Sequence, residues 1–552
     1  MGGIAQVVET ASLPETVAEV EAAICGGDVP RATALAQAAL DRDLEHPLFL
    51  NLRAHALEQS GHAGRALADL ERARELAPRD PFILNAMAEC LSRLDRQPEA
   101  VAAADAALKL NPEFARARYT KGLACEMLGE LAVAERCFQQ TVALEPAFAD
   151  AHARLAAIAS RRSNWAECRK FANQALLVDP RNSIALFAHA TADLANGALD
   201  EAERRLRVVL DDPGMSAHER ANAMSLLGDV RDRQGRIADA FALYEQANLE
   251  LQKFFAPTFA APQTESAKAL MARLTAYFEA APRSAWAARP SLPKAQSDPS
   301  AGHVFIVGFP RSGTTLLGQI LAAHPRAVTL EEKVPLIDAI KDFVDDPSGI
   351  DRLAAVSDTE IARYREAYWR HVRNFEMHVR DKVFVDKLPL NLLRLPLLGR
   401  LFPEAKILLA IRDPRDVVFS CFRRLFAMHQ FTYELLTLPG AAQSYASAMR
   451  LVEVFRERLP LSLMQVRNED IVEDFDGRVR EICAFVGLEW KDSLRNFGEK
   501  SRRQQIATPS ATQVARGLNR EGIGQWRRYA EQLAPVLPVL QPWVETFGYP
   551  PQ

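Results

Sequence analysis

Four prolines recur at a constant interval in the first half of this chain. Pro78, Pro112, Pro146 and Pro180 each lie 34 residues after the one before, and each follows an apolar run. Proline ends a helix because its ring removes a backbone N–H donor and clashes with the preceding turn. A period of this length predicts a series of equivalent helical units that bury their apolar faces against their neighbours, and not one globular core.

Small residues keep the same register as the prolines, with spacings of 12 and 7 within each unit. One small side chain per helix allows two antiparallel helices to approach closely. The pattern resembles the tetratricopeptide repeat over roughly residues 16–250. We therefore predict an N-terminal all-α solenoid over residues 16–281, of which 264–281 form a capping helix. The small positions are Ala54/Ala66/Ala73, Ala88/Ala100/Ala107, Gly122/Ala134/Thr141, Ala156/Cys168/Ala175, Ala190/Ala202/Val209 and Gly228/Ala240/Ala247.

The pattern changes after a segment rich in proline, serine and alanine. Residues 282–302 hold four prolines in 21 positions, which predicts an interdomain linker. Beyond it, short apolar runs alternate with amphipathic stretches, as in a parallel sheet covered on both faces. The prediction is an α/β, P-loop-like domain over 303–552. Its expected strands are 304–307, 383–385, 407–411 and 461–466, and its expected helices are 313–323, 389–401, 414–428 and 474–487.

A glycine-flanked turn joins the first of these strands to the first helix. Gly308 and Gly313 have P-loop spacing, and such a turn directs backbone N–H groups and a helix dipole at an anion. A loop for ATP or GTP needs a lysine after the second glycine, where Thr314 stands, and Arg412 follows the later strand in place of a magnesium-binding aspartate. The sequence predicts phosphate binding without a metal.

The loop itself, Pro310-Arg-Ser-Gly-Thr-Thr-Leu316, resembles the 5′-phosphosulfate loop of sulfotransferases that use 3′-phosphoadenosine 5′-phosphosulfate (PAPS). A second segment, 407–424, resembles the 3′-phosphate motif of that family, with an arginine at a strand end and a serine on the next helix. A segment near the end of the chain resembles one that closes over the donor. The resemblance implies PAPS as donor, 3′-phosphoadenosine 5′-phosphate (PAP) as product, and donor contacts from Arg311, Ser312, Gly313, Thr314, Thr315, Arg412, Ser420, Arg424 and Ser510.

Two further segments resemble the tyrosylprotein sulfotransferase branch. Residues 323–335 contain a Glu-Glu pair whose second member, Glu332, takes the position of the catalytic base. Residues 384–389 place Lys387 at the catalytic lysine, and with Arg311 it would stabilise charge on the transferred group. Since some sulfotransferases use a histidine base, His324 is the alternative.

The sequence departs from this branch at two positions. Gln525 stands where a nucleotide-contacting lysine is usual, and Asn468 where a tyrosine is common. The expected function is a PAPS-dependent sulfotransferase acting on protein tyrosine, with a protein or peptide acceptor bound by the repeats. The alternatives are a glycan or small-molecule sulfotransferase, and a repeat-based adaptor with a vestigial nucleotide-binding domain.

Charge and hydropathy argue against nucleic-acid-binding, membrane-spanning and secreted proteins. The 67 basic and 71 acidic side chains nearly cancel, which argues against a nucleic-acid binder. The longest apolar runs fall far short of the roughly 20 residues of a membrane span, and the first residues do not have the pattern of a secretory signal. From these observations we expect a cytoplasmic protein without a membrane span.

Overall fold

The computed structural model describes residues 12–261, 265–288, 298–375, 377–498, 517–520 and 522–551. The chain divides into two compact units, Met1–Glu201 and Ala202–Gln552, which are described separately. The sequence-based boundaries, with a linker at 282–302, stay a prediction.

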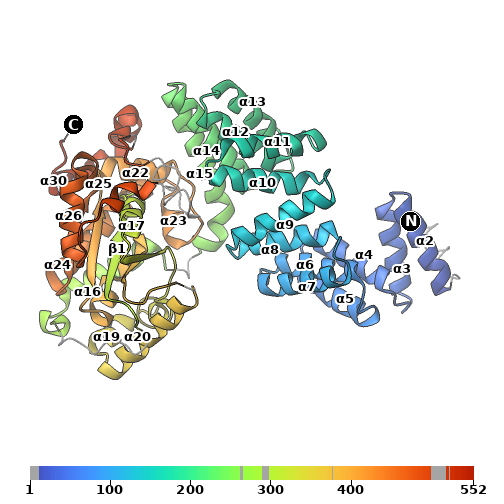
Figure 1. The fold of residues 1–552 in the computed structure, drawn as a ribbon, viewed down its shortest axis with the longest axis horizontal. Coiled ribbons are helices and arrows are strands. Elements are labelled where there is room, and N and C mark those ends of the chain that lie inside the picture. The colour runs from blue at the N-terminus through green and yellow to red at the C-terminus, as the bar shows by residue number, and fades with distance from the viewer. Residues whose placement is uncertain are drawn as a thin grey trace. The chain divides into compact units, whose positions relative to one another are not determined.

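The first unit consists of antiparallel helix pairs in succession (Figure 1). This confirms the predicted all-α repeat solenoid. Its helices are α2 (Leu13–Cys25), α3 (Val29–Leu40), α4 (Pro47–Gln59), α5 (Ala63–Leu76), α6 (Pro81–Arg93), α7 (Gln97–Leu110), α8 (Ala115–Met127), α9 (Leu131–Leu144), α10 (Ala149–Arg161), α11 (Trp165–Val178) and α12 (Ser183–Ala195), and α13 (Leu199–Leu210) continues into the second unit.

The recurring prolines and small residues have the roles expected of them. Each of the four prolines lies in the turn that follows the second helix of a pair. The small side chains are buried between helices. At Gly122 an added Cβ would lie 2.6 Å from the ring of Phe138, so glycine is required in this one repeat, where the equivalent residue of the neighbouring repeats is alanine. Close helix contact therefore explains the small-residue register.

A second periodic feature appears only in the backbone. Gly61, Asp95, Gly129, Ser163 and Gly197 all have φ between 56° and 79°, and they lie 34 residues apart, in the turns between paired helices. Glycine adopts this left-handed conformation without steric cost, whereas other residues carry a Cβ that clashes with the backbone. The turn geometry is thus constant although the residue is not.

The second unit contains a five-stranded, all-parallel sheet in the order β2-β3-β1-β4-β5. Four of its strands confirm the predicted ones within a few residues. The strand β2 was not predicted, because its segment was interpreted only as part of the active site. The strands are β1 (Gly302–Gly308), β2 (Ala327–Glu331), β3 (Val383–Lys387), β4 (Lys406–Ile411) and β5 (Ser462–Arg467).

Helices surround this sheet. The predicted helix 414–428 is shorter than expected and ends at Phe422. The helices are α14 (Ala217–Arg233), α15 (Ile237–Phe259), α16 (Ala267–Ala280), α17 (Thr314–Ala322), α18 (Ile337–Phe343), α19 (Gly349–Ala355), α20 (Asp358–Arg373), α21 (Leu395–Leu401), α22 (Pro414–Phe422), α23 (Gln430–Glu434), α24 (Leu438–Arg458), α25 (Asn468–Glu473), α26 (Phe475–Val486), α29 (Ala530–Leu533) and α30 (Leu537–Thr546); short 3₁₀ turns are η1 (Arg283–Trp286), η2 (Pro389–Arg394), η3 (Asp492–Asn496), η4 (Gln525–Tyr529) and η5 (Ala534–Val536).

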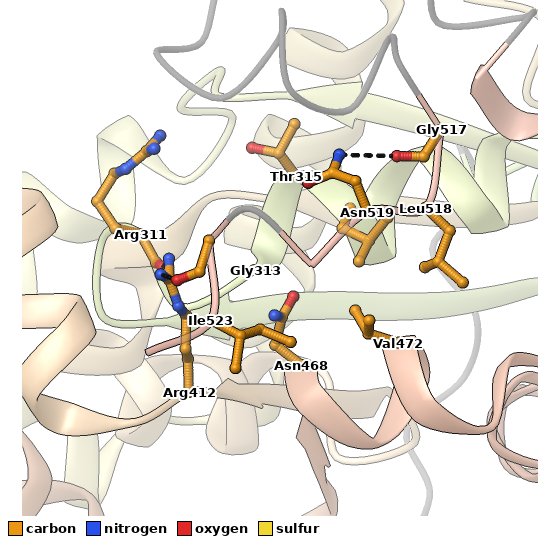
Figure 2. Close-up of a pocket in the computed structure, with 12 residues that line it drawn as sticks. Arg311, Gly313, Thr315, Arg412, Asn468, Val472, Gly517, Leu518, Asn519 and Ile523 are labelled. Carbon is orange, nitrogen blue, oxygen red and sulfur yellow. Dashed lines mark hydrogen bonds between the residues drawn. The ribbon is translucent and has the colours of Figure 1, made fainter. Parts of the chain in front are cut away.

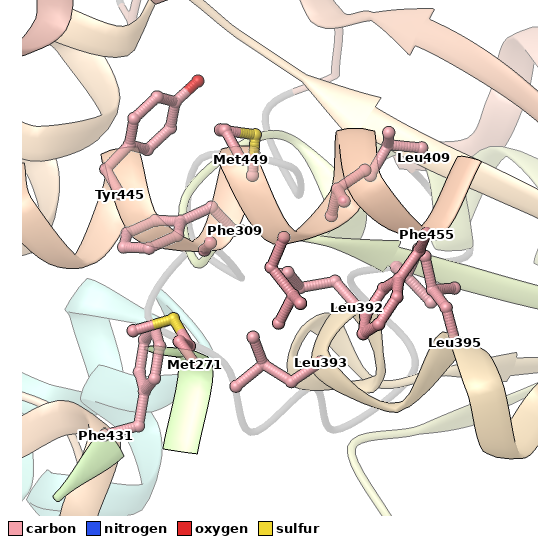
Figure 3. Close-up of a cluster of buried hydrophobic side chains, with 14 of the residues drawn as sticks. Met271, Phe309, Leu392, Leu393, Leu395, Leu409, Phe431, Tyr445, Met449 and Phe455 are labelled. Atoms are coloured by element: carbon pink, nitrogen blue, oxygen red, sulfur yellow. The ribbon is translucent and has the colours of Figure 1, made fainter. Parts of the chain in front are cut away.

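Each face of the sheet packs against its own apolar cluster. Along β1, Phe305 and Val307 belong to a cluster with α16, α20, α21, α22, α24 and α30, part of which is shown in Figure 3. Val304 and Ile306 belong to a second cluster with α17 and α26. Since successive side chains of a strand alternate between faces, this arrangement confirms a parallel sheet buried on both sides.

The last helix pair of the sequence repeat, α14 and α15, lies in the same compact unit as the sheet. Phe241 and Tyr244 of α15 belong to the larger apolar cluster. The ring of Phe241 lies 5.2 Å from that of Phe422, centroid to centroid, and Tyr244 contacts Phe419. The last pair of the repeat therefore packs into the core of the unit that contains the sheet.

No helix in the described ranges is both long and apolar enough to span a bilayer.

The left-handed turn positions yield a stability prediction. Ser163→Gly should stabilise the first unit by up to about 1 kcal/mol, because glycine removes the Cβ clash at φ 56°. Ser160→Gly, three residues earlier in helix α10, should destabilise it by about 0.5–1 kcal/mol, because glycine is a poor helix former. Urea unfolding followed by circular dichroism measures both. Equal shifts of the same sign would contradict the assignment.

Candidate functional site

The turn between β1 and α17 forms the centre of the site. Arg311 and Gly313 both have a left-handed backbone, with φ of 71° and 100°. Gly308 passes so close to the neighbouring strand that an added Cβ would lie 2.8 Å from the carbonyl oxygen of Ala410. The first turn of α17 begins at Thr314, so its free N–H groups face the loop. Strand pairing thus holds an anion-binding turn in a fixed shape.

Arginine side chains from two distant motifs meet at this turn. The Nε of Arg311 donates to the hydroxyl of Ser420 at 3.0 Å, and the Nη1 of Arg412 donates to the carbonyl oxygen of Arg311 at 3.3 Å. Burial, followed by the charges of Arg424 and Arg412, lowers the pKa of Arg311 to about 9. Buried guanidinium groups that repel one another favour the binding of an anion.

Two pockets open on the same loop. The arginine pocket is lined by Arg311, Gly313, Thr315, Leu316, Arg412, Asn468, Val472, Gly517, Leu518, Asn519, Gly522 and Ile523 (Figure 2). The glutamate pocket is lined by Pro310, Arg311, Gly313, Thr314, Thr315, Glu332, Leu388, Pro389, Leu390, Phe426, His429 and Thr432. They share Arg311, Gly313 and Thr315, so a group held at the loop is accessible from both sides.

A lysine and two carboxylates border the glutamate pocket. The Nζ of Lys387 lies 2.6 Å from Oε1 of Glu332 and 2.6 Å from Oε2 of Glu331. The side chain of Lys387 is fully buried, whereas that of Glu332 is 38% exposed. Gln319 donates to Glu331 at 2.8 Å, which fixes that carboxylate against α17. Glu332 is therefore the member of the pair that can reach a bound molecule.

His324 has a different environment from Glu332. Its Nδ1 accepts from the backbone N–H of Arg326 at 3.0 Å, and its Nε2 lies 2.9 Å from the carbonyl oxygen of Glu489. Both ring nitrogens are engaged with backbone groups, and the side chain is buried. This arrangement fits a structural role at the end of α17 better than proton transfer in the glutamate pocket.

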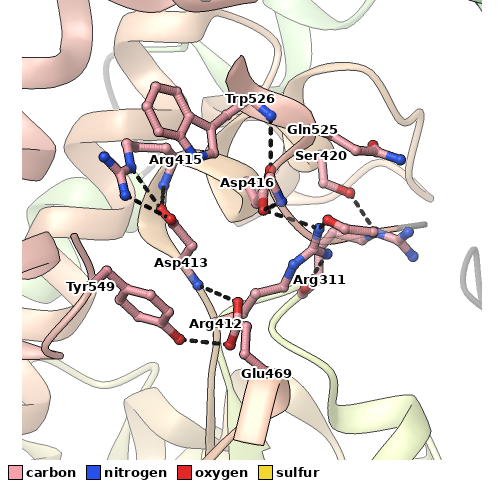
Figure 4. Close-up of polar contacts among 12 residues, drawn as sticks. Arg311, Arg412, Asp413, Arg415, Asp416, Ser420, Glu469, Gln525, Trp526 and Tyr549 are labelled. Atoms are coloured by element: carbon pink, nitrogen blue, oxygen red, sulfur yellow. Dashed lines mark hydrogen bonds and ion pairs between the residues drawn. The ribbon is translucent and has the colours of Figure 1, made fainter. Parts of the chain in front are cut away.

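The C-terminal part of the chain covers the arginine pocket through a polar network (Figure 4). Asp416 accepts from the N–H groups of Gly524 and Trp526, at 2.6 and 2.9 Å. Arg412 donates to the carbonyl oxygen of Gly522. The guanidinium of Arg415 lies 4.0 Å from the centre of the Trp526 ring. The segment after residue 522 is thus joined to the turn that follows β4.

The structure places most of the predicted donor residues at this loop. Ser312 is buried in it, and its N–H donates to Phe309. Ser510 lies outside the described residues. Of the two positions that depart from the branch pattern, Asn468 lines the arginine pocket and Gln525 accepts from Nη1 of Arg423 at 3.3 Å.

Three residues of the site were not predicted. His429 lines the glutamate pocket, Arg423 donates to Gln525, and Asp229 of α14 pairs with both Arg423 and Arg424. No motif marks them in the sequence. Among the described residues, no group of three or more histidine, cysteine, aspartate or glutamate side chains is arranged to hold a metal ion.

Comparison with known proteins agrees with this geometry. Residues 303–492 match the model of the sulfotransferase family. Protein-tyrosine sulfotransferase 1 of Danio rerio is 25% identical over 261 residues, which are 45% of this chain and 72% of that protein. Protein-tyrosine sulfotransferase 1 of Mus musculus is 37% identical over 128 residues, 22% of this chain and 34% of that one. The C-terminal half therefore contains a sulfotransferase domain.

Other proteins are similar to less than half of this chain. An uncharacterized protein of Aquifex aeolicus is 26% identical over 261 residues, and the match spans 45% of this chain but 33% of that protein. The sulfotransferase domain of the Synechococcus PCC 7002 olefin synthase is 22% identical, with 47% of this chain and 99% of that one covered and a TM-score of 0.33. A tetratricopeptide repeat protein of Parabacteroides merdae is 21% identical, with 46% and 94% covered and a TM-score of 0.33.

Proposed function

We propose that the sulfotransferase domain transfers the sulfuryl group of PAPS to the phenolic hydroxyl of a protein tyrosine. The observation that carries this proposal is the pair of pockets that meet at Arg311, Gly313 and Thr315. One pocket offers positive charge to an anionic donor, and the other offers a carboxylate to an acceptor. A transferred group at the shared loop would face both.

The donor is assigned to the arginine pocket on charge. A terminal phosphate carries about −1.5 to −2 charge at neutral pH, and arginine forks with hydroxyl donors match its oxygens. Arg412, Ser420 and Arg424 supply such donors for the 3′-phosphate, and the loop amides with Thr314 and Thr315 supply them for the 5′-phosphosulfate. Asn468 extends the same pocket toward the rest of the nucleotide.

The reaction proposed is an in-line displacement. The acceptor oxygen forms a bond to sulfur while the bond from sulfur to the 5′-phosphate oxygen breaks, and PAP leaves with that electron pair. Glu332 takes the hydroxyl proton. Lys387 and Arg311 stabilise the charge that spreads over the transferred and leaving oxygens, which is the main source of catalysis in such transfers.

The walls of the glutamate pocket support an aromatic acceptor. Leu388, Pro389, Leu390 and Phe426 give it apolar sides, and Glu332 lies on the same pocket. A phenol ring packs well against apolar walls, whereas a sugar would need hydrogen-bonding groups for its many hydroxyls. The named relatives act on protein tyrosine, and a helical repeat array offers an extended surface for a protein acceptor.

The role of Glu332 as base is tested by Glu332→Gln. Sulfuryl transfer should fall by about 10²–10⁴-fold, because a general base contributes that much, while PAP affinity stays nearly constant. Glu331→Gln is the matched control: it changes the adjacent carboxylate, which Gln319 holds away from the acceptor. Turnover of Glu332→Gln close to that of the wild type, with Glu331→Gln inactive, would assign the base to Glu331.

The role of Arg412 is tested by Arg412→Ala. Loss of one charge-assisted contact costs about 1.5–3 kcal/mol, so the affinity for PAP should fall at least roughly tenfold by calorimetry. Adenosine 5′-phosphosulfate, which lacks the 3′-phosphate, is the control ligand and should bind the variant and the wild type alike. Equal weakening of both ligands would place Arg412 away from the 3′-phosphate.

The role of the repeats is tested with a chain that begins at Asp211, ahead of α14, and so keeps the second unit except for the end of α13. It should retain PAP affinity and the sulfation of a small phenol. Labelled sulfate transfer into proteins of a lysate should drop, because tethering raises the local concentration of an acceptor. Undiminished transfer into protein would remove acceptor binding as the function of the first unit.

A further inference from the structure

The last helix pair of the repeat supports the end of α22, the helix that carries Ser420. The Nδ2 of Asn248 donates to the carbonyl oxygen of Phe422 at 2.8 Å. The hydroxyl of Ser225 donates to the carbonyl oxygen of Arg423 at 3.3 Å. The last carbonyl groups of a helix have no partner within it, so these side chains satisfy groups that would otherwise be buried unpaired. These contacts therefore stabilise the end of α22 at Phe422.

Asp229 is the charged centre of this contact. It accepts from Nη2 of Arg423 at 2.6 Å, from Nη1 of Arg424 at 2.8 Å and from the hydroxyl of Tyr244 at 2.8 Å. Burial alone would raise its pKa, but Arg424 and Arg423 outweigh burial and lower the pKa to about 2. Asp229 is therefore ionised at any pH at which the enzyme would work.

Arg424 is the partner whose orientation matters for the donor. Its side chain is 34% exposed, so its free end reaches solvent while one Nη contacts Asp229. An arginine side chain has many rotamers, and part of this conformational entropy is lost when the side chain is fixed. Asp229, a buried carboxylate on helix α14, orients the guanidinium of Arg424 before a ligand binds. The N–H groups of Arg424 that do not contact Asp229 can then donate to the ligand.

The same helix pair also holds one wall of the glutamate pocket. The side chain of Gln430 donates to the carbonyl oxygen of Phe259 at 3.2 Å, at the end of α15. Leu436 packs with Ala247 and Leu251 of α15 in a small apolar cluster. The segment from Arg423 to Leu436 therefore carries three residues of the glutamate pocket, Phe426, His429 and Thr432, and α14 and α15 contact it at both ends.

We propose that Asp229 is a positioning residue for the donor site, which holds Arg424 in the orientation that contacts the 3′-phosphate. The inference rests on the proposed function, since it needs a 3′-phosphate as ligand. The last repeat pair then contributes to donor binding through Asp229, whereas the preceding pairs remain available for a protein acceptor. Asp229 then lies 81 positions before Pro310, where the loop motif begins.

The test uses the full chain with Asp229→Asn and, as a matched control, Asp232→Asn. Asp232 lies on the same helix, its side chain is equally 10% exposed, and it accepts from the hydroxyl of Tyr529 at 2.6 Å. Asp229→Asn should weaken PAP binding roughly tenfold or more, by analogy with other groups that orient a ligand-binding side chain. Asp232→Asn should leave PAP affinity nearly unchanged, and neither should alter adenosine 5′-phosphosulfate binding.

A double-mutant cycle separates positioning from general loss of structure. In an Arg424→Ala background, Asp229→Asn should cause no further loss of PAP affinity, because the residue that it orients is already gone. Additive losses would mean that Asp229 acts by another route and would overturn the proposal. Tighter PAP binding by Asp229→Asn alone would also overturn it, since the carboxylate would then compete with the ligand.

Two results distinguish the positioning role of Asp229 from the proposed function, which is sulfuryl transfer from PAPS. If the wild-type chain does not bind PAP, the proposed donor and this inference fall together. If the wild type binds PAP and Asp229→Asn binds it equally well, the positioning role alone is wrong. Should Asp229→Asn not fold, Asp229→Glu and Asp232→Glu replace the pair: weaker PAP binding by the first alone supports the proposal, and equal binding overturns it.

Discussion

Buried positive charge is the constraint on which the second unit depends. A guanidinium group removed from water must have acceptors around it, or the fold is destabilised. Arg412 donates to carbonyl oxygens of the loop and of the C-terminal segment, and Arg423 pairs with Asp229. Because each acceptor comes from a different part of the chain, the same charges that prepare an anion site also hold distant segments together.

This constraint joins the last helix pair of the repeat to α22 within the second unit. The last helix pair supplies a carboxylate, two caps for α22 and two aromatic rings to the core. A repeat array that only recruited substrate would need no such contact with the site. The helix pair α14 and α15 therefore has the sequence pattern of the repeat, but it packs in the core of the second unit.

The different roles proposed for Lys387 and Glu332 follow from how deeply each side chain is buried. Lys387 is enclosed between two carboxylates and cannot move far, whereas Glu332 is partly exposed at the edge of its pocket. A fixed cation suits charge stabilisation, and an accessible carboxylate suits proton transfer. Arg311, Gly313 and Thr315 line both this pocket and the arginine pocket, so a donor and an acceptor bound as proposed would meet at the shared loop.

The sequence by itself determined the periodic and the contiguous features. The proline interval predicted the helical repeats, and two short motifs predicted the anion-binding loop and the strand-end arginine, because local spacing dictates turns and helix ends. Only the tertiary structure decided where α22 ends and that Asp229 meets Arg424. These depend on packing between segments about 200 residues apart, and no local pattern encodes a contact made by chain folding.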